Sequence, residues 1–419
     1  MTLMKVGYLC SDIDIPIFGH EGCSIHIREF TNGLIEAGHD AFIVCSWAGE
    51  SNNVTTRARI YPVGPSGLDA VAWQLIEQEA LIQDHNLERD LRSLLYNLWL
   101  KNEGGSIIER ERPELLYERY SLFGYAGIEL SRRYSIPLIL EVNAPLCLEQ
   151  AGYEKFPLAG TAEGIEAEIL RGADAVIAVS QWLKEWILSR GVDEQRVHVI
   201  PNAAPGRLFD REVSGDRVKE RYDLNGKQVV GFVGSFQPWH DVGGLLDAFH
   251  QLYQQDNSVR LLLVGAGPQR VSLEQSAHRM GLASAVVFTG SVPYELVPEF
   301  IAAMDVAVAP FRWTQELLYG SPIKLFEYMA AGKPTVAAAL GQITEVVKHG
   351  ETGWLYLPGD YEELAEGISM LLCSPDLAST IGKAGKQKIL QEHTWKAVAE
   401  RAVRLGETLR QPRASRGTR

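Results

Sequence analysis

The chain has 419 residues, of which 46% are hydrophobic and 22% are charged. These values lie close to the averages of globular proteins, so they exclude disordered, collagen-like and disulfide-rich miniprotein classes. The length predicts two or three domains. Forty basic and fifty-three acidic side chains give a net charge of −13. That balance argues against a broad nucleic-acid-binding surface, which needs clustered Lys and Arg.

The five cysteines favour a reducing compartment. They are odd in number, widely spaced and form no C-x-x-C pair, so neither a disulfide framework nor a zinc site is predicted. The apolar stretch after Lys5 is too short for a signal peptide, and no run of about 18 apolar residues follows. We therefore expect a cytoplasmic protein without a membrane span, and we leave peripheral membrane contact open.

Short β-branched apolar runs alternate with longer helical patterns, which predicts βαβ units on parallel sheets. A first series of expected strands covers residues 5–10, 41–46, 115–118, 137–142, 175–179 and 197–200. A second series covers residues 229–233, 259–264, 285–288, 306–309 and 334–338. The two series predict the α/β class, with two doubly wound, Rossmann-like domains.

The domain boundary is expected in the segment IPNAAPGRLFD and the charged stretch after it. We predict a first domain over 1–205, a second over 206–394, a terminal helix over 395–411 that crosses back to the first domain, and a disordered tail over 412–419. A helical insertion is expected at about 68–103. It is either a solvated helical cover or a surface for an acceptor or partner.

Several familiar motifs are missing from the chain. Gly265-Ala266-Gly267 lacks the third glycine of a G-x-G-x-x-G fingerprint, so no dinucleotide cofactor is expected. The sequence contains no H-E-x-x-H, G-x-S-x-G or P-loop string, which leaves zinc-protease, serine-hydrolase and P-loop functions without support. No metal site is predicted.

The most informative stretch is YGSPIKLFEYMAAGKPTVA, residues 319–337. Ser321 suits a helix N-cap and Pro322 the first helical position, so a helix is expected to start here. Lys324 then lies in the first turn, where the helix dipole makes a cation unfavourable. A bound diphosphate would neutralise both, using the N–H groups of Ile323 and Lys324 and the ammonium group.

Glu327 follows Lys324 by three residues and so lies on the same helix face, one turn deeper. A carboxylate at that depth can accept two hydrogen bonds from ribose hydroxyls. The alternative is an ordinary surface ion pair between Lys324 and Glu327.

Two glycine-bearing loops also follow expected strands, where parallel sheets bind ligands. Gly22 lies in the loop after the first strand, before a helix that Ser24 could cap, and its backbone could approach an anion. In the second domain, Ser235 and His240 lie in the loop GSFQPWHD. There His240 is either structural or a ligand contact at the strand end.

Eight strings follow one another along the chain: LLYERYSLFGYAG, LILEVNAP, DAVIAVS, VIPNA, GSFQPWH, LLVGAGP, FTGSVPYELVPEFIAAMDVAVAPF and, most specific of them, SPIKLFEYMAAGKP. In this order they resemble glycosyltransferase family 4, whose members are retaining enzymes with the GT-B fold of two facing Rossmann-like domains and a cleft between them. The resemblance covers nearly the whole chain.

The resemblance implies a nucleotide-diphosphate sugar bound mainly by the second domain, over 206–394, and makes the first domain, over 1–205, the acceptor side. It assigns the ribose to Glu327, the diphosphate to the turn from Ser321 to Lys324, and the nucleobase to the backbone at 291–293, around Val292. From the first domain it brings Gly22 to the phosphates and Asn143 to the donor sugar.

Four positions depart from the family pattern. Tyr319 stands where a sugar-binding glutamate is common. Ser235 and His240 replace the usual arginine and lysine of the phosphate loop. Asn143 lies where a histidine is common near the sugar. We therefore expect Lys324 and the helix N-termini to neutralise the negative charge of the diphosphate, with His240 as a partial replacement for the missing cations.

The resemblance implies metal-independent transfer of a hexosyl group, with a UDP-sugar as the expected donor and with retention at the anomeric carbon. The acceptor is not identified by the sequence and could be a saccharide, a lipid-linked saccharide or a small molecule. Two alternatives stay open: a sugar-nucleotide epimerase of the same architecture, and a non-catalytic nucleotide-sugar-binding protein.

Overall fold

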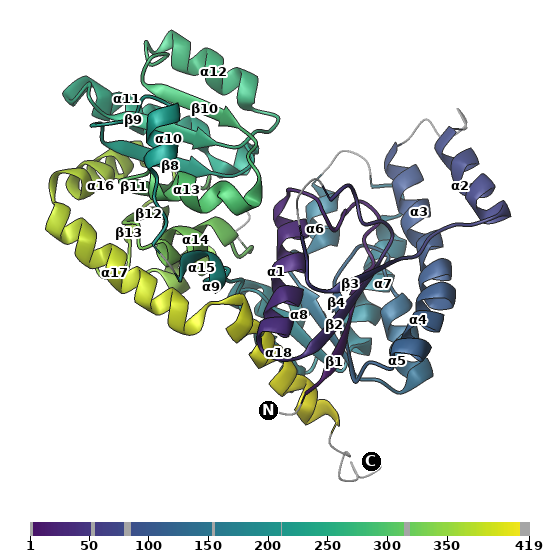
Figure 1. Ribbon diagram of the computed structural model, residues 1–419. Helices are drawn as coiled ribbons and strands as arrows, with labels where there is room; N and C mark the ends of the chain where they lie inside the picture. The colour runs from purple at the N-terminus through teal and green to yellow at the C-terminus, as the bar shows by residue number, and fades with distance from the viewer. Residues whose placement is uncertain are drawn as a thin grey trace. The chain divides into compact units, whose positions relative to one another are not determined.

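A computed structural model describes residues 3–51, 55–78, 85–152, 156–210, 212–313 and 319–410 (Figure 1). The chain divides into two compact units. The first contains Met1–Pro201 and Trp395–Arg419, and the second contains Asn202–Thr394. The chain thus passes from one unit to the other after Pro201, whereas the sequence analysis predicted the boundary after residue 205. The expected tail at 412–419 lies outside the described residues.

The first unit is built on a seven-stranded parallel sheet in the order β3-β2-β1-β4-β5-β6-β7. Its strands are β1 (Lys5–Cys10), β2 (Asp40–Cys45), β3 (Arg59–Pro62), β4 (Leu115–Arg119), β5 (Leu138–Val142), β6 (Ala175–Ala178) and β7 (Val197–Val199). All six strands expected from the sequence are confirmed. The edge strand β3 was missed, because it has four residues, none of them buried, and so lacks the apolar run of an inner strand.

Helices connect these strands and include an insertion between β3 and β4. The insertion consists of α2 (Leu68–Gln78), α3 (His85–Trp99), a π-helical turn (Leu100–Gly104) and α4 (Gly105–Glu111). The remaining helices of the unit are α1 (Gly22–Glu36), α5 (Ala126–Tyr134), α6 (Leu146–Ala151), α7 (Ala159–Gly172), α8 (Gln181–Ser189), a short 3₁₀ turn (Glu194–Arg196) and α18 (Trp395–Arg410).

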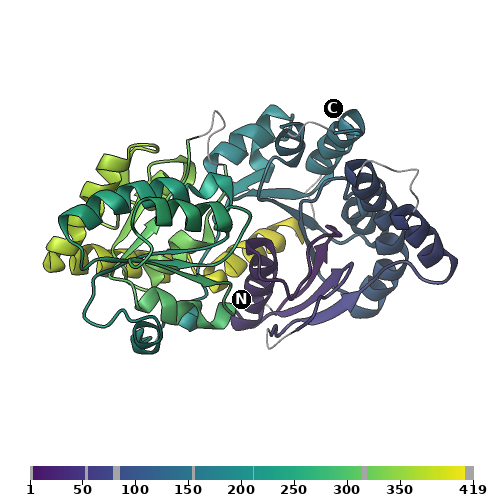
Figure 2. The ribbon, with the colours of Figure 1, turned by 90° about the horizontal axis from the view of Figure 1, so that it is seen from above.

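Helix α18 completes the first unit, although it is the last helix of the chain. It packs along α1, and the two helices lie side by side in both ribbon views (Figures 1 and 2). A side chain could not fit at Gly33 in α1, because a Cβ atom there would lie 2.5 Å from the Trp395 carbonyl oxygen. Backbone contact of this kind binds the chain's end firmly to its beginning.

The second unit has a six-stranded parallel sheet in the order β10-β9-β8-β11-β12-β13. Its strands are β8 (Val229–Val233), β9 (Arg260–Val264), β10 (Val286–Gly290), β11 (Val306–Ala309), β12 (Thr335–Ala338) and β13 (Trp354–Tyr356). The five expected strands are confirmed, and the three-residue edge strand β13 was missed.

The order of this sheet reverses at β8 and β11, so right-handed crossovers place α11 (Val242–Gln255) and α14 (Ile323–Ala330) on opposite faces. Helix α11 packs against α16 (Tyr361–Cys373), and α14 packs against α17 (Pro375–Glu392). The other helices are α9 (Gly206–Phe209), α10 (Asp216–Arg221), α12 (Arg270–Arg279), α13 (Val297–Ala302), α15 (Gly341–Val346) and 3₁₀ turns at Pro238–His240 and Tyr294–Leu296. The loops after β8 and β11 meet at this reversal, where parallel sheets bind ligands.

Both units therefore have the expected doubly wound α/β fold. Within the described ranges, none of the helices has the combination of length and hydropathy needed to cross a membrane.

Candidate active site

The N-terminus of α14 is the centre of the candidate site in the second unit. The helix begins at Ile323, after Pro322 in an extended conformation, and no side chain among the described residues caps its first turn. The expectation that Ser321 is the N-cap and Pro322 the first helical residue is therefore wrong. Ser321 Oγ instead accepts a 3.0 Å hydrogen bond from the Asn202 backbone N–H, and Asn202 Nδ2 donates to the Ser321 carbonyl oxygen at 2.8 Å. The uncapped turn leaves backbone donors for a ligand.

Lys324 places a buried amine at this helix start. Its Nζ lies 4.3 Å from the ring centroid of Phe232 and 5.4 Å from that of Phe311. Nζ makes no hydrogen bond to any residue that the structure describes. Burial lowers the pKa of Lys324 to about 7, against an opposing effect of Glu327. A buried ammonium group that contacts two aromatic rings but no acceptor is a strong candidate for binding an anion.

Two glycine loops surround this amine. Gly234, directly after β8, has a φ of +148°, and a Cβ atom there would lie 2.7 Å from Lys324 Nζ. A Cβ atom at Gly265, after β9, would lie 2.0 Å from the Gly234 carbonyl oxygen. Phe236 N–H donates to the Ala266 carbonyl oxygen at 2.9 Å, which joins the two loops further. The glycines therefore allow backbone to pack on backbone beside Lys324.

His240 lies in the 3₁₀ turn that follows Ser235, with its ring 5.8 Å from Phe232 and 5.5 Å from Phe311 between centroids. Its Nδ1–H donates to the Ser235 carbonyl oxygen. Burial, and then the nearby Lys324 ammonium, lower the pKa of His240 to about 3, against the opposing effect of that hydrogen bond. A pKa this low leaves the ligand-free His240 uncharged near neutral pH, so its expected role beside a diphosphate stays a prediction.

Glu327 is buried one turn deeper in α14, and its Oε1 accepts a 2.7 Å hydrogen bond from the Tyr294 hydroxyl. Tyr294 directly follows residues 291–293, so the carboxylate is joined to the loop around Val292. The structure thus brings together the two segments that the family resemblance assigns to the nucleoside. Lys324 and Glu327 do not form the surface ion pair that was the alternative, because both side chains are buried.

Gly22 and Asn143 lie in the first unit. Gly22 is the first residue of α1, and apart from its chain neighbours and the helix backbone no described atom lies within 4 Å of the position that a Cβ atom would take there. Glu21 precedes the helix as its N-cap, and Ser24 is buried within the first turn, so the expectation that Ser24 caps α1 is wrong. Asn143 follows β5, and its buried Nδ2 has no hydrogen-bond acceptor in the described part of the chain. Gly22 therefore has open space beside its backbone, and Asn143 has a donor that the described residues leave unused.

A buried hydrogen-bonded pair near Asn143, formed by His26 and Glu141, was missed by the sequence analysis. His26 Nε2 and Glu141 Oε1 lie 2.7 Å apart, with both side chains almost fully buried. The pKa of Glu141 stays below its ordinary value, because His26 and Arg119 outweigh the effect of burial. Trp395 of α18 contacts the His26 ring edge-on, with centroids 4.8 Å apart. The pair fixes the end of β5 and so the position from which Asn143 projects.

Phe232, Phe311 and Tyr294 were also missed as parts of the site. Phe232 and Phe311 lie at or next to apolar strand sequences, Tyr294 lies in a short turn, and no sequence signal separates them from ordinary buried residues. Tyr319, which stands in place of the usual glutamate, lies just before the entry to α14 and is half-buried.

Two family models match the chain. The model described as Glycosyltransferase Family 4 matches residues 21–205, and the model described as Glycosyl transferases group 1 matches residues 227–374. Together they cover most of both units.

The chain is 30% identical over 270 residues to a GDP-mannose-dependent α-(1-6)-phosphatidylinositol monomannoside mannosyltransferase of Mycolicibacterium smegmatis, covering 64% of this chain and 69% of that protein. It is 23% identical over 413 residues to a glycogen synthase of Mycobacterium tuberculosis, with 94% of each covered. The crystal structure of Anabaena HepE in complex with UDP and glucose superposes with a TM-score of 0.73 at 19% identity, covering 97% of this chain and 100% of that one. The chain therefore belongs to glycosyltransferase family 4 and has the GT-B fold.

Proposed function

We propose that this glycosyltransferase moves a hexosyl group from a nucleotide-diphosphate sugar, with a UDP-sugar as the expected donor, to an acceptor hydroxyl with retention at the anomeric carbon. The observation that carries the proposal is the buried Lys324 amine, which has no acceptor among the described residues and lies at the uncapped start of α14. Two phosphate groups would supply the negative charge that this position lacks.

The nucleoside end of the donor is assigned to Glu327 and the loop around Val292, one turn along α14 from Lys324. Glu327 would accept hydrogen bonds from the ribose hydroxyls through its carboxylate, which the Tyr294 hydroxyl orients. The backbone around Val292 would meet the base. In the first unit, Gly22 has the open space that an approaching phosphate requires, and Asn143 Nδ2 is an unused donor for the sugar.

In the proposed reaction, the bond between the anomeric carbon and the β-phosphate oxygen breaks while the acceptor oxygen bonds to the same carbon. The acceptor proton passes to the departing phosphate. Negative charge grows on the diphosphate as it leaves, and Lys324 and the α14 backbone donors would stabilise it in place of a metal ion. His240 is neutral at first and would become a donor only after it takes up a proton.

The relatives carry two different nucleotides in their names: GDP-mannose for the mycobacterial mannosyltransferase, and UDP with glucose for HepE. We expect UDP here. Calorimetric titration with UDP and with GDP tests this choice, and tighter binding of GDP would overturn it.

Incubation of the protein with the matching sugar nucleotides and acceptor extracts, followed by mass spectrometry and NMR, tests the reaction. A new glycoside with the donor's anomeric configuration and free nucleoside diphosphate is expected. An intact epimerised sugar nucleotide would indicate an isomerase instead. Nucleotide binding without turnover of any donor, by transfer or by slow hydrolysis, would indicate a binding protein.

A further inference from the structure

The pairing of β8 with β11 ends before either strand does. Among the described residues, their parallel register joins Val230 to Val306 and Gly231 to Ala307. Strand β8 nevertheless runs on to Val233, and β11 also continues. The two strands meet at the reversal of the sheet order, where open α/β sheets bind ligands. The last backbone groups of β8 on this side therefore need a partner other than a strand.

Val233 is the residue that needs this partner. The next residue, Gly234, donates its N–H to the Val264 carbonyl oxygen of β9 at 2.9 Å. Because successive peptide groups of a strand point to opposite neighbours, the N–H and C=O of Val233 point to the β11 side. Val233 is buried, and a buried peptide group without a partner costs about as much free energy as a lost hydrogen bond.

The Tyr328 hydroxyl supplies both hydrogen bonds. It accepts a bond of 2.6 Å from the Val233 N–H and donates one of 3.3 Å to the Val233 carbonyl oxygen. Tyr328 belongs to α14 and is fully buried. Burial raises the pKa of Tyr328, so the hydroxyl keeps the proton that it donates. A side chain of α14 thus replaces one step of the sheet.

The strand end that Tyr328 holds is also the part of β8 that contacts Lys324. Phe232, directly before Val233, has its ring centroid 4.3 Å from Lys324 Nζ. On the other side of Val233, a Cβ atom at Gly234 would lie 2.7 Å from the same nitrogen. Lys324 and Tyr328 are four residues apart and so share one face of α14. The helix therefore carries both the amine and the group that fixes the strand end beside it.

We propose that Tyr328 is a positioning residue of the diphosphate site. Its hydroxyl holds the end of β8, and with it the segment from Gly234 to His240, at the distance from Lys324 at which the segment's backbone and the ammonium group can bind the same phosphate. The proposal rests on the proposed function, because it takes the ligand beside Lys324 to be a diphosphate. It goes further by giving a role to a side chain that touches no substrate.

The test is Tyr328→Phe in the full chain, with UDP and uridine as ligands. Phenylalanine keeps the ring in the core, so the variant should fold, but the Val233 backbone loses the hydroxyl. UDP affinity by calorimetry is expected to fall about tenfold, whereas uridine affinity by NMR titration should stay within about twofold of the parent. A general disturbance of α14 would weaken both ligands, because Glu327 is assigned to the ribose. Equal losses for both, or parental UDP affinity, would overturn the proposal.

A double-mutant cycle with Lys324→Met tests whether Tyr328 acts through the amine. When Lys324 is already replaced, Tyr328→Phe is expected to change UDP affinity by less than about twofold. A purely structural role would give the same loss in both backgrounds. An undiminished loss in the Lys324→Met background would therefore overturn the positioning role.

Amide hydrogen exchange measures the hydrogen bond in the parent protein and needs no variant. The Val233 N–H is expected to exchange as slowly as that of Gly231, which lies in the paired part of β8. Exchange at the rate of an open loop would overturn the proposal.

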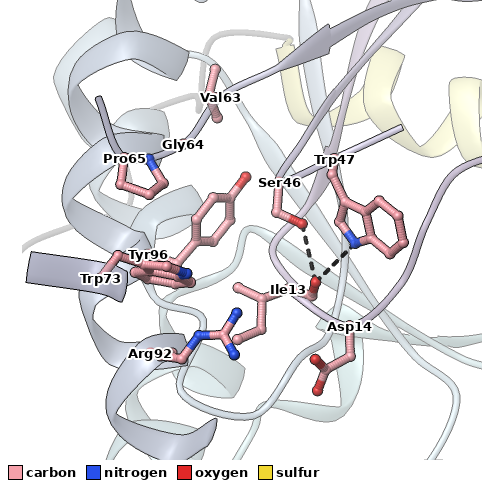
Figure 3. Close-up of a pocket in the computed structure, with 10 residues that line it drawn as sticks. All are labelled: Ile13, Asp14, Ser46, Trp47, Val63, Gly64, Pro65, Trp73, Arg92 and Tyr96. Carbon is pink, nitrogen blue, oxygen red and sulfur yellow. Dashed lines mark hydrogen bonds between the residues drawn. The ribbon is translucent and has the colours of Figure 1, made fainter. Parts of the chain in front are cut away.

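Tyr96→Phe is the matched control. Tyr96 belongs to α3 in the first unit, where it lines a pocket of about 350 Å³ together with Trp73 and Arg92 (Figure 3). Its hydroxyl is also buried but makes no hydrogen bond to any residue that the structure describes, so its removal should change neither UDP affinity nor the melting temperature. Equal losses of UDP affinity in Tyr96→Phe and Tyr328→Phe would overturn the proposal. Failure of the parent protein to bind UDP or GDP would count against the proposed function instead.

Discussion

The Tyr294 hydroxyl and Glu327 Oε1 lie 2.7 Å apart in the second unit. This hydrogen bond joins the loop after β10 to the second turn of α14, which are the two segments assigned to the base and to the ribose. The position of the carboxylate therefore depends on a residue of the neighbouring loop, and the dependence can be measured.

Glu327→Gln should weaken UDP binding without loss of the fold. The amide oxygen can still accept from Tyr294, but charge-assisted hydrogen bonds to ribose hydroxyls, worth about 1.5–3 kcal/mol, are lost. The expected loss of affinity is about 10–150-fold by calorimetry. 2′,3′-Dideoxyuridine diphosphate is the control ligand, because it should bind the parent and the variant almost equally. Parental UDP affinity in a folded Glu327→Gln protein would contradict the ribose assignment.

Tyr294→Phe should have a smaller effect of the same kind. It removes one neutral donor to the carboxylate, worth about 0.5–1.5 kcal/mol, and leaves the ribose-binding group in place. We expect UDP affinity to fall about 2–12-fold, and we expect this loss to disappear when Glu327 is already replaced. A double-mutant cycle measures the coupling, and additive losses would argue against positioning of Glu327 by Tyr294.

Lys324→Met separates binding of an anion from packing. Methionine keeps an unbranched side chain beside the Phe232 and Phe311 rings. It removes the amine, whose pKa burial has lowered to about 7. The ligand-free variant should melt no lower than the parent, because the buried charge is unfavourable to folding. Turnover should fall by about 10²–10³, as when one preorganised donor to a developing oxyanion is removed. Near-parental turnover would exclude Lys324 from the reaction.

The pH dependence of UDP binding should report the same amine. In the free protein Lys324 loses its proton near pH 7, and a bound diphosphate must raise that pKa. Binding therefore takes up a proton above pH 7, and UDP affinity should fall as the pH rises from 7 to 9, by up to about tenfold per unit. Calorimetric titrations at pH 8 in two buffers of different ionisation enthalpy measure the number of protons that the protein takes up when UDP binds. His240→Asn should keep this slope, since the pKa of His240 is about 3, whereas Lys324→Met should abolish it.

Gly234→Ala should disturb the site through its backbone. The new Cβ atom would lie 2.7 Å from Lys324 Nζ, at a residue whose φ of +148° disfavours a side chain. We expect a lower melting temperature and UDP binding at least tenfold weaker. Gly243→Ala is the matched control, because no atom lies within 4 Å of that Cβ position in α11, and alanine there should stabilise by about 0.5–1 kcal/mol. Equal behaviour of the two variants would contradict a steric role for Gly234.

The sequence predicted every inner strand of the two sheets, because each combines a buried apolar run with flanking turn residues, as β8 and β11 do. It also predicted that Lys324 and Glu327 lie one turn apart on one helix. The caps were predicted wrongly for a physical reason. Ser321 is a suitable cap in local terms, but its hydroxyl bonds to Asn202, which is 119 positions away in the chain, and local rules do not include such a partner.

Charge states and pockets depend on the fold in the same way. His240 is ordinary in sequence, and its pKa falls because β8 and β11 bring Phe232, Phe311 and Lys324 to one place. Trp47, Trp73 and Tyr96 come from three separate segments. Only the strand order and the inserted helices show that they line one pocket.

The return of α18 to α1 has a consequence for synthesis on the ribosome. Domains usually fold in the order in which they are made, but here the first unit lacks α18 until residues 395–410 have left the exit tunnel. The second unit is continuous from Asn202 to Thr394 and can complete its fold while the first still exposes the apolar face of α1. The part of the protein made first is thus the last to mature, and a chain that stops before Trp395 would leave the earlier unit unfinished for as long as it exists.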